Sequence, residues 1–138
     1  MCPDRSHIET FTTRIMEALS PRADVVAVYL FGSIVNGPHT HESDVDIAIL
    51  FSGNVEKTEL LSLQQELSDC LGAEADLVDL GRAPVVLRMQ VLKKGRKLFD
   101  RKPSVTTSLI VRTLFEYDDL KRVIKPVEDN ILRGGIYG

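Results

Sequence analysis

The stretch FGSIVNGPHTHESDVDIAIL, residues 31–50, combines features that seldom occur together. A run of strand-forming residues ends at Phe31 and is followed at once by Gly32 and Ser33. Ten residues later, Asp44 and Asp46 begin a second apolar run, DVDIAILF. A buried strand normally excludes carboxylates, because an unpaired charge out of water is costly. The sequence therefore predicts that something at this strand end compensates two negative charges.

The spacing of these residues indicates what the compensating group is. Alternate residues of a strand share a face, so Asp44 and Asp46 are expected about 7 Å apart on one face. Paired carboxylates can bind Mg²⁺, which keeps water ligands and shares its remaining positions with substrate phosphates. Gly32 permits close backbone approach to a ligand, and Ser33 with the N–H groups that follow can hold phosphate oxygens. A metal site beside a phosphate cradle is typical of phosphoryl or nucleotidyl transfer.

Composition sets the frame for this site. The 138 residues, 43% hydrophobic and 27% charged, suit one soluble domain. The polar N-terminus and the lack of a long apolar run predict no signal peptide and no membrane span. Cys2 and Cys70 match no zinc or redox spacing, so reduced thiols and a cytoplasmic location are expected.

The charges are unevenly distributed along the chain. Residues 1–81 hold four Lys/Arg against fourteen Asp/Glu, whereas residues 82–125 hold twelve against four. The basic second half could form a polyanion or partner surface, or simply the solvated faces of helices. The net charge of −3 argues against a dedicated nucleic-acid-binding protein.

Hydrophobic periodicity predicts strands interleaved with helices. Helices are expected over residues 6–19, 55–71, 84–94 and 105–124, and strands over 25–31, 44–51, 75–80 and 97–99. Gly72 fits a helix C-cap, Pro126 is expected to end the last helix, and Cys70 is expected in the core. The predicted fold is α/β (α+β), one domain over residues 1–138 with its core at about 6–100 and a C-terminal helix and tail at about 104–138.

Gly-Ser, ten residues, then Asp-x-Asp is also a family signature. In this respect the chain resembles the DNA-polymerase-β-like nucleotidyltransferases, in particular their minimal members, the MNT proteins that are paired with HEPN toxins. The resemblance covers about residues 6–100 and implies a mixed sheet flanked by helices, with a third carboxylate on a later strand. By position this is Asp76 in EADLVDL, although Asp79 competes. The two have opposite parity on a strand, so only one can face Asp44 and Asp46.

The resemblance also implies a mechanism. Asp44, Asp46 and Asp76 would bind two Mg²⁺ ions and catalyse transfer of AMP from ATP, with Gly32 and Ser33 at the phosphates. Ser43 is either a turn residue or part of the nucleotide site. His39 and His41 are expected to be exposed loop residues that could contact the nucleotide.

The same resemblance implies a partner. Only about 35 residues follow Lys102, too few for the acceptor-binding domain of larger relatives. The acceptor site is therefore expected to be shared with a HEPN toxin, whose tyrosine hydroxyl would be adenylylated, making this protein the antitoxin. Two alternatives stay open: a binding antitoxin without catalysis, and a small-molecule nucleotidyltransferase whose acceptor pocket spans a homodimer.

Overall fold

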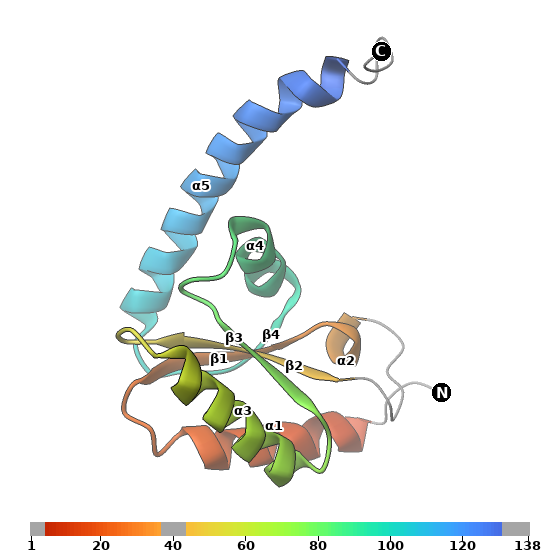
Figure 1. The fold of residues 1–138 in the computed structure, drawn as a ribbon, viewed down its shortest axis with the longest axis vertical. Helices are drawn as coiled ribbons and strands as arrows, with labels where there is room; N and C mark the ends of the chain where they lie inside the picture. Colours follow the sequence, from red (N-terminus) through yellow and green to blue (C-terminus); the bar gives the residue numbers. More distant parts are fainter. Residues whose placement is uncertain (1–4, 37–43, 131–138) are drawn as a thin grey trace.

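The computed structural model describes residues 5–36 and 44–130 (Figure 1). Its elements are α1 (Arg5–Leu19), β1 (Val25–Phe31), α2 (Ser33–Asn36), β2 (Val45–Phe51), α3 (Lys57–Leu71), β3 (Ala75–Asp79), α4 (Val85–Lys94), β4 (Arg96–Asp100) and α5 (Pro103–Asn130). The four strands form one sheet in the order β3-β2-β1-β4. β1 runs antiparallel to β2 and β4, and β2 runs parallel to β3. The expected mixed sheet flanked by helices is confirmed.

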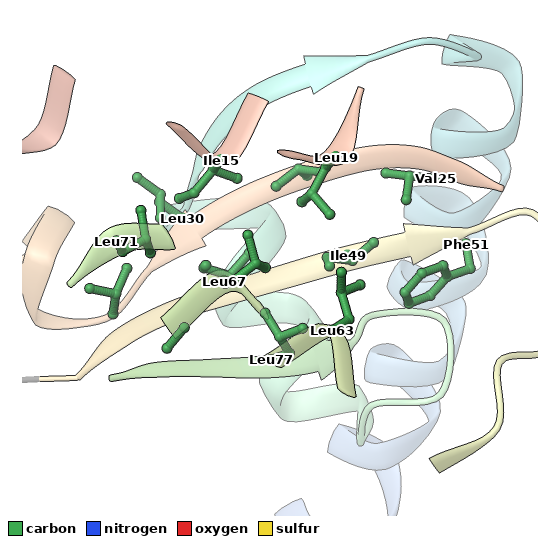
Figure 2. Close-up of a cluster of buried hydrophobic side chains, with 14 of the residues drawn as sticks. Ile15, Leu19, Val25, Leu30, Ile49, Phe51, Leu63, Leu67, Leu71 and Leu77 are labelled. Atoms are coloured by element: carbon green, nitrogen blue, oxygen red, sulfur yellow. The ribbon is translucent and has the colours of Figure 1, made fainter. Parts of the chain in front are cut away.

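One face of the sheet is covered by α1 and α3. Leu63, Leu67 and Leu71 recur every four residues and form the buried side of α3. They pack with Ile15 and Leu19 of α1 against alternate strand residues, as the close-up of this core shows (Figure 2). The strand residues on this face include Leu30, Val45, Ile47, Ile49, Phe51, Ala75 and Leu77.

The opposite face is covered by α4 and the first half of α5. Val91 of α4 and Leu109 of α5 pack with Ala48 and Leu50 of β2. Because strand residues alternate between faces, the positions of β2 and β3 that do not enter the α1/α3 core lie on this side. Asp46 and Asp76 are among them, next to the α4 layer.

Two local expectations prove wrong. The last helix does not end at Pro126 but continues to Asn130. Proline removes one i→i−4 hydrogen bond, and α5 tolerates that loss four residues before its end. Cys70 is exposed rather than in the core, because it lies about 100° around the helix from the buried Leu71. The C-cap at Gly72 is confirmed, with a left-handed φ of 66°.

Within residues 5–36 and 44–130, no helix combines the length and the apolar character that crossing a membrane requires.

Candidate active site

The pairing of β2 with β3 brings distant carboxylates together. In this parallel ladder Val45 lies opposite Ala75, and Asp46 lies opposite Asp76. Val45 and Ala75 are buried in the core under α1 and α3, so the two aspartates lie on the α4 side of the sheet. Asp44 precedes Asp46 by two residues and is exposed just before β2 begins. Three carboxylates therefore gather at one end of the sheet.

Asp46 is the electrostatic centre of this group. Its side chain is partly buried, and burial is the main cause that raises its pKa above the ordinary value of 3.8. The negative charges of Asp76 and then Asp44 raise the pKa further. Like charges held this close repel one another, and a bound cation relieves such repulsion. The site therefore has the electrostatics of a cation-binding site.

Gly32 packs directly against Asp46. It adopts a positive φ of 79°, and a Cβ built on it would overlap the Oδ2 atom of the Asp46 carboxylate. The Val35 N–H donates to the Gly32 carbonyl at 3.1 Å, which closes the turn into α2. Both the backbone conformation and the space require glycine here. The turn formed by Gly32 and Ser33 is thus fixed beside the carboxylates.

Asp79 has different surroundings. Its register partner is Ile49, three rungs from the pair formed by Asp46 and Asp76. Burial raises the pKa of its carboxyl, an effect opposed by Arg82 and by hydrogen bonds from the backbone N–H groups of Gly81 and Arg82. An oxygen of Asp79 lies 4.0 Å from the Arg82 guanidinium. Asp79 therefore stabilises the turn that follows β3.

Three further candidates have no described position. Ser43, His39 and His41 lie in the segment 37–43, outside the described residues. Their proposed contacts with a nucleotide stay predictions.

The donor groups that the site offers to a metal ion are aspartate carboxylates. Within the described residues, no three His, Cys, Asp or Glu side chains are arranged to hold a metal ion by themselves. Carboxylate oxygens alone nevertheless suit Mg²⁺, which takes one or two carboxylates and completes its shell with water and substrate phosphates. The residues present fit a magnesium ion that is shared with a nucleotide, rather than a closed protein cage.

Basic residues that the sequence spacing did not single out lie near this end of the sheet. β4 pairs with β1 so that Arg96 is opposite Leu30 and Lys97 is opposite Tyr29. Leu30 is two residues before Gly32, so the first residues of β4 lie beside the strand that leads into the glycine turn. The charge asymmetry indicated a basic second half, but only the pairing of β1 with β4 shows where this part of it lies.

The fold and the gathered carboxylates are those of a nucleotidyltransferase. Residues 13–104 match the family described as polymerase beta, nucleotidyltransferase, and the chain belongs to this family. The resemblance inferred from the Gly-Ser and Asp-x-Asp spacing is thereby confirmed.

Similarity to individual proteins indicates more about this chain than the family match does. The chain is 31% identical to the protein adenylyltransferase MntA of Shewanella oneidensis over 105 residues. The aligned residues cover 76% of this chain and 75% of MntA. A chain of a crystallised toxin–antitoxin with AMP-PNP superposes with a TM-score of 0.77 at 29% identity, over 88% of this chain and 98% of that one. A chain of the complex between a tri-AMPylated Shewanella oneidensis HEPN toxin and MNT antitoxin gives 0.73 at 26% identity, over 90% and 98%.

Proposed function

We propose that this protein is an antitoxin that transfers AMP from ATP to a tyrosine hydroxyl of a partner HEPN toxin. The observation that carries the proposal is the register of β2 and β3, which sets Asp46 opposite Asp76 with Asp44 two residues away. The likeness to MntA, a protein adenylyltransferase, supports AMP as the transferred group. The likeness to a chain crystallised in a toxin–antitoxin complex supports a toxin as the acceptor.

Each residue has a distinct task in the proposed reaction. Asp44 and Asp46 would hold magnesium shared with the triphosphate, and Gly32 and Ser33 would bind phosphate oxygens through backbone and hydroxyl donors. Magnesium, when bound, neutralises charge on the phosphates and lowers the pKa of an attacking hydroxyl. Asp76, which is exposed beside Asp46, would orient the acceptor hydroxyl and accept its proton. The acceptor oxygen bonds to the α-phosphorus as the bond to pyrophosphate breaks.

The test is the intact mass of a candidate HEPN toxin after incubation with this protein, ATP and Mg²⁺. We expect the toxin to gain the mass of one or more AMP groups. Asp46→Asn should abolish the gain, because it removes a charge from the metal site without changing shape. Asp24→Asn is the matched control, since Asp24 precedes β1 at the far end of the sheet and pairs with Arg22 at 3.4 Å.

Two outcomes would contradict the proposal. Transfer by Asp46→Asn at the wild-type rate would remove these carboxylates from the chemistry. A toxin that is inhibited but keeps its mass would favour the binding antitoxin without catalysis.

A further inference from the structure

The exposed apolar side chains of the molecule are concentrated on α5. Among the described residues seven large hydrophobic side chains are exposed, and five of them belong to this helix: Val105, Ile110, Val111, Leu114 and Phe115. Phe115 is 70% exposed and Leu114 is 50% exposed. Single exposed apolar residues are common, but a contiguous group on one element indicates an interaction site. Ile110, Val111, Leu114 and Phe115 are called the α5 patch below.

The α5 patch borders a groove. The groove, of about 470 Å³, lies between α4 and α5 and is lined by Val86 and Met89 of α4 and by Leu114 and Tyr117 of α5, among others. Val86 is a sixth member of the seven exposed apolar side chains. The surface therefore joins an apolar helix face to an apolar groove, which is a shape that accepts a helix from another protein.

The part of α5 that carries the patch is bound to α4 by a buried arginine. The buried Arg88 of α4 donates from Nε to the Ala83 carbonyl at 2.9 Å and from Nη1 to the Thr113 hydroxyl at 3.1 Å. Its second terminal nitrogen forms an ion pair with Glu116. Beyond this anchor α5 extends away from the sheet (Figure 1). A partner docked on α5 would therefore be held in a defined position relative to the sheet.

The comparisons separate α5 from the catalytic part of the family. The family match ends at residue 104, where α5 has just begun. The match to the toxin–antitoxin chain covers 88% of this chain. Because residues 1–104 make up only three quarters of the 138, that match must extend into α5. α5 is thus shared with a chain crystallised as part of a toxin–antitoxin, yet lies outside the general nucleotidyltransferase core.

The charge around the groove selects among possible occupants. Lys93, Lys94 and Lys121 line it, and Asp118, its acidic residue, is paired with Arg122 at 2.9 Å. A two-fold contact sets the same surface of both copies face to face, so self-association here would bring two lysine-lined grooves together. A partner with acidic side chains beside an apolar stripe avoids this repulsion.

We propose that the α5 patch and the adjoining groove dock the HEPN toxin, through an amphipathic helix whose apolar stripe covers Leu114 and Phe115 and whose acidic flank faces Lys93 and Lys121. The inference rests on the proposed function, because it takes the toxin as the partner. It assigns recognition of the acceptor to α4 and α5, apart from the carboxylates that carry out the chemistry.

The experiment measures two affinities for each variant by titration calorimetry. One is for the candidate HEPN toxin, and the other is for AMP-PNP with Mg²⁺. The double variant Leu114→Ser/Phe115→Ser and the charge reversal Lys93→Glu/Lys121→Glu change exposed side chains, so both should fold. We expect toxin binding to weaken at least about tenfold in each, with AMP-PNP affinity unchanged. Leu61→Ser is the matched control, since Leu61 is 53% exposed on α3 and should bind the toxin as the wild type does.

Wild-type toxin affinity in both variants would overturn the docking site. So would sedimentation showing that the toxin-free wild type is a dimer which the double variant dissociates, because the surface would then belong to a second copy. Failure of the proposed function has a different signature: the wild type binds the toxin through this surface but never adds AMP to it.

Discussion

At the scale of the residue, Asp46 is a partly buried carboxylate near the start of β2. The carboxylates of Asp44 and Asp76 lie near it, and the backbone of Gly32 packs against it. Its raised pKa means that the folded protein holds this proton more tightly than the unfolded chain does. The metal-free fold therefore loses stability as the pH rises from the ordinary pKa of 3.8 through the raised value. The site is destabilised for the purpose of binding, as functional sites commonly are.

Asp46→Asn should accordingly stabilise the metal-free protein. We expect the variant to melt above the wild type at neutral pH in the presence of a chelator, with the difference disappearing below about pH 4, where the wild-type carboxyl is also neutral. Adding Mg²⁺ and AMP-PNP should reverse the order, because ligand binding stabilises only a protein that binds it. Calorimetric melting curves across this pH range provide the measurement. A variant that melts lower at neutral pH without metal would show that the carboxylates do not repel one another as described.

Gly32 is the second residue with a strict local requirement. Gly32→Ala places a side chain at a positive φ, which costs about 1–2 kcal/mol, and puts its Cβ into the Asp46 carboxylate. We expect lower stability and at least a tenfold loss of AMP-PNP affinity. Gly53→Ala is the matched control, since a Cβ there meets nothing within 4 Å.

Ser33→Ala should have a milder effect. We expect it to lower the affinity for AMP-PNP about fivefold, if one hydrogen bond of about 1 kcal/mol is lost. Unchanged affinity in Gly32→Ala and Ser33→Ala would place the nucleotide elsewhere.

At the scale of the element, the pairing of β2 with β3 distinguishes two aspartates of the same strand. Asp76→Asn should abolish AMP transfer while AMP-PNP still binds, because Asp44 and Asp46 remain. Asp79→Asn should keep most of the activity, since Asp79 lies away from the other carboxylates and the asparagine oxygen can still accept the hydrogen bonds from the turn at Gly81 and Arg82. Single-turnover assays, with folding checked by circular dichroism, measure both. An inactive Asp79→Asn beside an active Asp76→Asn would reverse the assignment.

The helices show how far local signals reach. Gly72 ends α3 because glycine, which has no Cβ, adopts the left-handed conformation of a helix C-cap without strain. Pro126 carries an equally local signal but does not end α5. One missing hydrogen bond near the end of a long helix is a bounded cost, which the hydrogen bonds of the preceding turns can outweigh.

At the scale of the whole molecule, the two faces of the sheet have different tasks. The face under α1 and α3 holds the larger apolar core (Figure 2). The other face holds a smaller apolar core and carries Asp46 and Asp76 at one end, and Arg88 links α4 to α5 on this side. Chemistry and the proposed docking of the toxin thus fall on the same side of the sheet, on separate elements. This separation is why the α5 variants should affect toxin binding and leave AMP-PNP binding intact.

The sequence by itself determined what depends on near neighbours. The two-residue repeat of a strand placed Asp44 and Asp46 together, parity separated Asp76 from Asp79, and the Gly-Ser and Asp-x-Asp spacing identified the family. Only the tertiary structure decided that Asp76 stands opposite Asp46, that Arg96 lies beside the strand leading into Gly32, and that Phe115 is exposed. Backbone conformation and side-chain alternation are fixed within a few residues, whereas strand register and burial depend on which distant segments become neighbours.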